Sequence, residues 1–142
     1  MNDFAVLRAP SQVLFGVGMA AAAGRVAAGH GRRVLVCTDQ IIAGTPGFAT
    51  VRESLEGDVA MFSDAAVDVP RSAIDAAVAL GREFEPDVIV AVGGGSVIDL
   101  AKVAALLRAL PDARLHIFGG CGHATPLERT DEFNDLVRNF LA

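Results

Sequence analysis

The sequence has few cysteines, and the two it has, Cys37 and Cys121, stand far apart without a CxxC spacing. A chain of 142 residues with 52% hydrophobic content can bury a core of ordinary size without a disulfide framework. Isolated thiols are typical of a reducing compartment, so we expect a cytoplasmic protein. The first ten residues, MNDFAVLRAP, lack the continuous apolar stretch of a signal peptide, which agrees with this expectation.

Clustered positive charge is also missing. The 12 lysines and arginines are scattered, only Arg32 and Arg33 are adjacent, and the formal net charge is −5. We therefore expect no nucleic-acid partner, because polyphosphate backbones are bound by basic stripes. No apolar run approaches the length that crosses a bilayer, so we expect no membrane insertion either.

Histidine occurs only three times, at positions 30, 116 and 123. His30 lies in the turn-like segment AGHGRR, and His116 lies within an expected strand. Neither has a partner at the spacing of metal ligands, so both are interpreted as surface or packing residues. No metal site is expected in this chain.

Short apolar segments rich in Val, Ile and Phe alternate with segments of helical spacing. The expected strands are residues 34–37, 59–62, 88–92 and 115–118, and clear helical faces run through residues 74–84 and 133–141. Apolar strands separated by helices predict a single α/β domain over residues 1–142, with a Rossmann-like, doubly wound parallel sheet of about four strands. Residues 4–18, which turn around Pro10, are expected to form an edge hairpin.

The segment AVGGGSVIDLAK, residues 91–102, has the chemistry of a phosphate site. A strand ending at residue 92 delivers Gly93, Gly94 and Gly95 at its carboxyl end, where the missing Cβ atoms let a ligand approach the backbone. Ser96 is expected to cap a helix from residue 97 to about residue 110. The positive end of the helix dipole at that cap favours a phosphate group.

A simpler interpretation is that Ser96 and Asp99 only cap this helix, and that Asp99 and Lys102 form a weak exposed ion pair. Asp39 shifts the balance toward a nucleotide, because it follows the strand 34–37 where an acid can accept from ribose hydroxyls. If the first strand is central, with the second and third on either side, Asp39 and the glycines border one crevice.

Three segments together resemble a known family: VLFGVG (13–18), RVLVCTDQ (33–40) and FEPDVIVAVGGGSVIDLAK (84–102). They are similar to the amino-terminal domain of the iron-dependent alcohol dehydrogenases, which include the maleylacetate reductases, over about residues 4–107. The resemblance implies an oxidoreductase in which residues 93–96 hold the dinucleotide pyrophosphate and Asp39 lies at the adenosine ribose. Asp99 and Lys102 complete the motif, and an acid at position 39 favours NAD over NADP.

The resemblance ends near residue 107. Such enzymes hold a divalent metal in a second, helical domain with one Asp and three His, and this chain has three His in all. Residues 108–142 instead look like the last strand, histidine loop and last helix of an α/β-hydrolase that cleaves ring-fission products. His123 in GCGHATPLE matches the triad histidine there, yet no GxSxG nucleophile motif occurs in the sequence.

Four functional hypotheses follow. The favoured one is a dinucleotide-binding domain of a dehydrogenase, truncated and catalytically incomplete alone. A second is a full oxidoreductase whose metal domain comes from a partner chain. A third is a hydrolase that uses His123 as a base, and a fourth is a fusion product without selected activity. A homodimer is also expected, because the loss of a domain would expose apolar surface.

Overall fold

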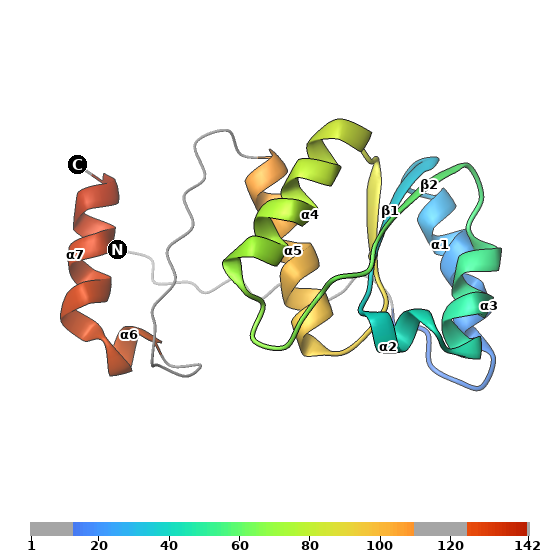
Figure 1. Ribbon diagram of the computed structural model, residues 1–142, viewed down its shortest axis with the longest axis horizontal. Helices are drawn as coiled ribbons and strands as arrows, with labels where there is room; N and C mark the ends of the chain where they lie inside the picture. Colours follow the sequence, from blue (N-terminus) through green and yellow to red (C-terminus); the bar gives the residue numbers. More distant parts are fainter. Residues whose placement is uncertain (1–12, 110–124, 142) are drawn as a thin grey trace, which may run out of the picture. The chain divides into compact units, whose positions relative to one another are not determined.

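The structure of the protein is a computed structural model, and it describes residues 13–109 and 125–141 (Figure 1). The chain divides into two compact units, Met1–Pro111 and Asp112–Ala142, and each is described by itself. Within the described residues, no helix is both long enough and apolar enough to span a membrane.

The described part of the first unit is built on three parallel strands. They are β1 (Arg33–Cys37), β2 (Asp58–Phe62) and β3 (Val88–Ala91), and their order in the sheet is β2-β1-β3. Leu35 of β1 pairs with Ala60 on one side and with Ile89 on the other. The expected parallel α/β fold is therefore confirmed, and the first strand is central in the sheet. The described residues contain three of the four expected strands, and the expected strand at 115–118 lies outside them.

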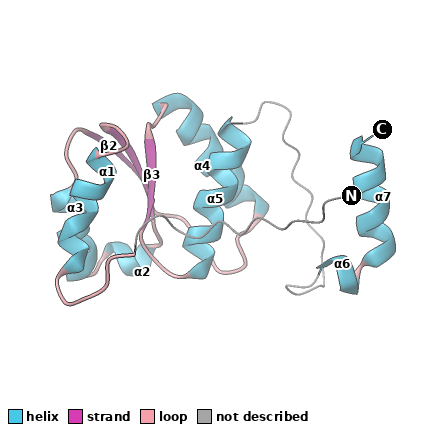
Figure 2. Ribbon diagram, turned by 180° about the vertical axis from the view of Figure 1, so that it is seen from behind, coloured by secondary structure: helices cyan, strands magenta, loops and turns pink. Residues whose placement is uncertain are grey.

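Helices cover both faces of this sheet, and Figures 1 and 2 show them on opposite sides. One side carries the 3-10 helix η1 (Met19–Ala22), α1 (Ala23–Ala28) and α3 (Pro46–Ser54), and the other carries α4 (Arg71–Phe84) and α5 (Gly95–Ala109). The short helix α2 (Gln40–Ala43) follows β1. Crossovers to opposite faces leave β1 with neighbours on both sides, which is the doubly wound arrangement.

Burial follows from the apolar runs. The residues of β1 from Val34 to Cys37 are almost fully buried, because the strand is central and covered on both faces. Val34 and Val36 pack with Phe48 and Leu55 in one core cluster. Gly24 brings α1 and α3 together, since a Cβ there would lie 1.7 Å from the carbonyl oxygen of Ser54.

At the amino end of the sheet, Asp87 joins β1 to the start of β3. Its Oδ2 accepts hydrogen bonds from the backbone N–H groups of Arg33 and Arg32, each at 2.9 Å. These two bonds favour the charged carboxylate and lower the pKa of Asp87 below its usual value. Gly31 is required beside it, because a Cβ would lie 2.2 Å from the Asp87 Cβ.

The expected edge hairpin is wrong for the arm that the structure describes. Residues 13–18 form no strand, and Phe15 is 99% exposed. Gly16 and Gly18 have positive φ angles and start a turn that leads into η1, with Met19 N–H donating to the Gly16 carbonyl oxygen at 3.3 Å. The left-handed conformation of Gly18 turns the chain into η1, so an extended strand cannot continue through it. The other arm lies outside the described residues.

The second unit contains two described helices, α6 (Thr125–Glu128) and α7 (Thr130–Leu141). The helix expected near the carboxyl terminus is confirmed and begins at Thr130, whose hydroxyl donates to the Pro126 carbonyl oxygen at 2.9 Å. Arg138 and Asp135 form an exposed ion pair along α7 at 2.9 Å. The idea that both units share one sheet stays a prediction, because the strand that would join them is not described.

Candidate functional site

A cleft of about 680 Å³ lies at the carboxyl ends of the three strands. Its lining comes from one segment after each strand: residues 39–42 after β1, residues 64–67 after β2 and residues 94–97 after β3. Parallel strands bring such segments to one sheet edge, and connections leaving β1 in opposite directions open a crevice there. The structure thus brings Asp39, Gly94 and Gly95 to one cleft, whereas Gly93, the other glycine expected there, is not among its lining residues.

The fold requires glycine at only one of the three positions 93, 94 and 95. A Cβ at Gly93 would lie 2.6 Å from Val97 Cγ2 and 2.9 Å from Val97 Cβ, so packing against α5 requires glycine there. A Cβ at Gly94 or Gly95 would meet no heavy atom within 4 Å, and neither residue has a positive φ. The fold therefore does not need glycine at these two positions, and the open space beside them suits a ligand that approaches the backbone.

Helix α5 begins earlier than the sequence predicts. Gly95 is its first residue, and Ile98 N–H donates to the Gly94 carbonyl oxygen at 3.2 Å, so Ser96 is not the cap. Gly94 stands at the N-cap position, where glycine is well accepted although it has no capping side chain. Ser96 still lines the cleft, in a first helical turn whose N–H groups lack carbonyl partners within the helix. These amides and the helix dipole favour an anion.

Asp39 has a local role that the sequence analysis missed. Its carboxylate caps α2, because Oδ1 accepts from the Ile42 N–H at 2.8 Å. The side chain also lines the cleft and is half-buried. A carboxylate has two oxygens, so capping by Oδ1 leaves Oδ2 as an acceptor for a ligand hydroxyl.

Asp64 and Gln40 are further cleft residues that the sequence analysis did not identify. The Gln40 Nε2 donates to Asp64 Oδ1 at 2.8 Å and to Ser63 Oγ at 3.1 Å. The signal for Asp64 was present, because it comes shortly after the strand at 59–62, much as Asp39 follows the strand at 34–37. Its bond to Gln40 was not visible, since the two residues meet only when β1 and β2 pair.

Thr38 joins the carboxyl ends of the three strands. It is the one buried polar residue among those described, with 0% of its surface exposed. Its Oγ1 donates to the Val92 carbonyl oxygen at 2.8 Å, and its N–H donates to the Phe62 carbonyl oxygen at 2.8 Å. The end of β1 is thereby tied to the ends of both neighbouring strands.

Asp99 and Lys102 do not line the cleft. They lie beyond the first turn of α5 as an ion pair at 3.9 Å, with side chains 67% and 69% exposed. This is the weak surface pair of the simpler interpretation, which contributes little to stability. A role for either residue at the nucleotide stays a prediction.

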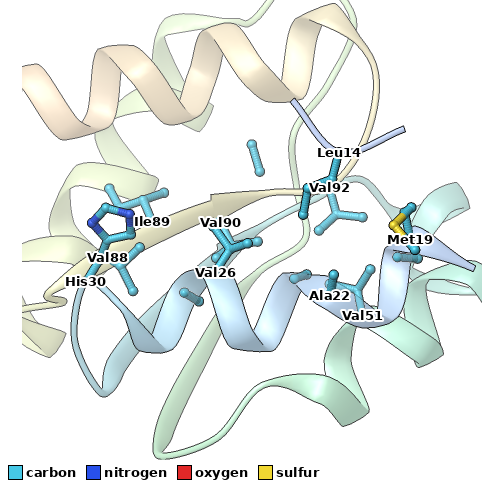
Figure 3. Close-up of a pocket in the computed structure, with 14 residues that line it drawn as sticks. Leu14, Met19, Ala22, Val26, His30, Val51, Val88, Ile89, Val90 and Val92 are labelled. Carbon is cyan, nitrogen blue, oxygen red and sulfur yellow. The ribbon is translucent and has the colours of Figure 1, made fainter. Parts of the chain in front are cut away.

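A second cavity of about 660 Å³ lies beside β3 and is lined by η1, α1 and the strand itself. Figure 3 shows Val88, Val90 and Val92 lining it together with Met19 and Val26. His30, two residues after the end of α1, is the one titratable side chain among its described lining residues. Without an acid or nucleophile beside that imidazole, the lining offers apolar contact and no acid–base pair.

The described residues do not fit a divalent metal ion. No three of their His, Cys, Asp or Glu side chains come together where they could hold one. His116, His123 and Cys121 lie outside the described residues, so the hydrolase-like role expected of His123 stays a prediction.

Comparisons with known proteins agree with the parallel α/β fold of the first unit. The family model of iron-containing alcohol dehydrogenases matches residues 10–129. Maleylacetate reductase from Sphingobium indicum is 38% identical over 104 residues, which are 72% of this chain and 29% of that protein. The crystal structure of NADH-dependent butanol dehydrogenase A from Thermotoga maritima matches 78% of this chain and 29% of its own, with a TM-score of 0.67 and 25% identity.

A shorter match is with a hydrolase. The 2-hydroxymuconate semialdehyde hydrolase of Pseudomonas putida is 46% identical over 46 residues, which are 32% of this chain and 16% of that protein. This partial match is only a weak hint of the hydrolase-like tail.

This chain spans less than a third of the length of the maleylacetate reductase and the butanol dehydrogenase. The family match covers most of the 142 residues, and the chain belongs to the iron-containing alcohol dehydrogenase family.

Proposed function

We propose that the first unit is the dinucleotide-binding part of an oxidoreductase of this family and that it binds NAD in the cleft at the carboxyl ends of β1, β2 and β3. The observation that carries this proposal is the pair Gly94 and Gly95. Nothing in the fold requires glycine at either position, and both line the same cleft as Asp39.

The residues of the cleft have complementary roles in this proposal. The first-turn amides of α5 bind the pyrophosphate, and the absence of a Cβ at Gly94 and Gly95 lets its oxygens reach them. Asp39 accepts from the ribose hydroxyls through the oxygen that does not cap α2. When bound, the nicotinamide supplies or accepts the hydride. The negative charge of Asp39 favours NAD over NADP.

Hydride transfer needs more than the described residues provide. No three ligand side chains among the described residues come together where they could hold a metal ion. We therefore expect the first unit alone to bind NAD without turning over an alcohol. Further residues would have to come from outside the described ranges or from a partner chain. We further propose a homodimer in the cytoplasm, and light scattering at several concentrations tests the dimer.

Calorimetric titration with NAD tests the main proposal. We expect one site per chain, and weaker binding in Asp39→Asn, which keeps an N-cap for α2 but loses the charge that accepts from ribose. Asp58→Asn, at the opposite end of the sheet, serves as the matched control and should bind like the wild type. A folded wild-type protein that gives no binding at millimolar NAD would contradict the proposal.

A further inference from the structure

Asp64 is the charged cleft residue to which the proposed function gives no role. We infer that Asp64 is a second specificity-determining residue, which acts with Asp39 against dinucleotides that carry a 2′-phosphate. This inference rests on the proposed NAD site and adds a residue to it.

The position of Asp64 is set by hydrogen bonds across the sheet edge. Gln40, the residue after Asp39, donates from Nε2 to Asp64 Oδ1 at 2.8 Å and to Ser63 Oγ at 3.1 Å. Asp39, Gln40 and Asp64 all line the cleft. The amide hydrogen bond holds one oxygen of the Asp64 carboxylate and leaves its negative charge in place.

The sheet order gives the direction of a bound dinucleotide. Its pyrophosphate would lie at the start of α5, after β3, and its adenosine ribose would lie at Asp39, after β1. Because the order is β3, β1, β2 across the sheet, the next segment along this path is the one after β2, which contains Asp64. A 2′-phosphate on that ribose would therefore enter the side of the cleft that holds two carboxylates.

No basic side chain offsets these acids within the cleft. Its described lining residues include Asp39 and Asp64 and contain neither lysine nor arginine. A 2′-phosphate carries nearly two negative charges, and sites that accept it commonly provide an arginine. The added phosphate thus meets two like charges and no partner, whereas the free 2′-hydroxyl of NAD can donate to a carboxylate.

The experiment measures the dissociation constants of NAD and of NADP by calorimetry for the wild type, Asp64→Asn, Asp39→Asn and the double variant. Asparagine keeps an acceptor oxygen for Gln40, so the local hydrogen bond can persist. We expect Asp64→Asn to lower the preference for NAD over NADP by about five- to tenfold, the size of one screened charge interaction near a surface. The double variant should lower it further, and added salt should reduce the difference.

Asp58→Asn is again the control, because it removes the same charge at the first residue of β2, at the opposite end of that strand. Its preference should match the wild type within twofold. An unchanged preference in Asp64→Asn, with NAD still bound by the wild type, would overturn the inference and leave the NAD site standing. Equal losses for NAD and NADP would also overturn it. A wild type that binds neither dinucleotide would refute the proposed function together with this inference.

Discussion

Alanine at Gly95 is the substitution that best separates folding from ligand binding in this chain. Gly95 is the first residue of α5, and a Cβ there meets no heavy atom within 4 Å. Alanine at a compatible position reduces the entropy of the unfolded chain and stabilises by about 0.4–1 kcal/mol. We therefore expect the free energy of unfolding of Gly95→Ala to equal or exceed that of the wild type by up to about 1 kcal/mol.

The same methyl group should weaken NAD binding. It occupies the open space through which a phosphate oxygen approaches the first-turn amides, so at least one hydrogen bond to a charged group is lost. Such a bond is worth about 1.5–3 kcal/mol, which corresponds to roughly a 10- to 100-fold loss of affinity. Urea denaturation followed by circular dichroism measures the stability, and calorimetry with NAD measures the affinity.

Two further glycines make the experiment decisive. Gly47 on α3 also has nothing within 4 Å of an added Cβ and does not line the cleft, so Gly47→Ala should keep both stability and affinity. Gly93→Ala should lose about 1–3 kcal/mol of stability, because its Cβ would overlap Val97. If Gly95→Ala bound NAD within twofold of Gly47→Ala, or if it unfolded like Gly93→Ala, the separation of roles would be refuted.

Three other predictions concern the fold. Gly24→Ala should lower the unfolding free energy by about 2 kcal/mol or more in urea, because its Cβ would lie 1.7 Å from the Ser54 carbonyl oxygen; a loss below about 0.5 kcal/mol would contradict this. Because the pKa of Asp87 is lowered in the folded protein, its carboxylate stabilises the fold at pH values above its unfolded pKa, which is near 3.9. This stabilisation is lost as the pH falls through the native pKa. The wild type should therefore lose more stability than Asp87→Asn between about pH 5 and pH 3, and parallel losses would exclude this account. Burial raises the pKa of Cys37 to about 11, so in a Cys121→Ser background its thiol should react with a disulfide reagent at about pH 8 only after unfolding, and fast labelling of the native protein would show that it is accessible.

The sheet could be predicted because its information is local. Each strand is a short apolar run between turn residues, and runs that are apolar on both faces indicate parallel strands under helices. The crevice followed from the same reasoning, since the carboxyl ends of parallel strands lie at one edge. The sequence predicted that Asp39 and residues 93–95 border one crevice, and in the structure Asp39, Gly94 and Gly95 line one cleft, whereas Gly93 does not.

What escaped prediction depends on contacts between distant residues or on competition between caps. Gln40 meets Asp64 across 24 positions of sequence, and Thr38 meets Val92 across 54, so no local pattern marks either pair. Ser96 has the better capping side chain, yet the helix begins one residue before it, at Gly95, four residues after the end of β3. Periodicity finds the apolar residues of a helix more reliably than its first residue.

If the proposed function holds, the electrostatics of the cleft would favour one orientation of a dinucleotide. The side after β3 presents the uncompensated amides and the positive dipole end of a 15-residue helix, whereas the side after β1 and β2 presents Asp39 and Asp64. On the proposed function, phosphates are attracted to the first side and repelled from the second. A ligand that carries hydroxyls at one end and a pyrophosphate at its centre satisfies both sides only when its ribose lies toward the acids. On this proposal, the pair Gly94 and Gly95 would let the phosphates approach, and the two acids would determine which dinucleotide can extend beyond them.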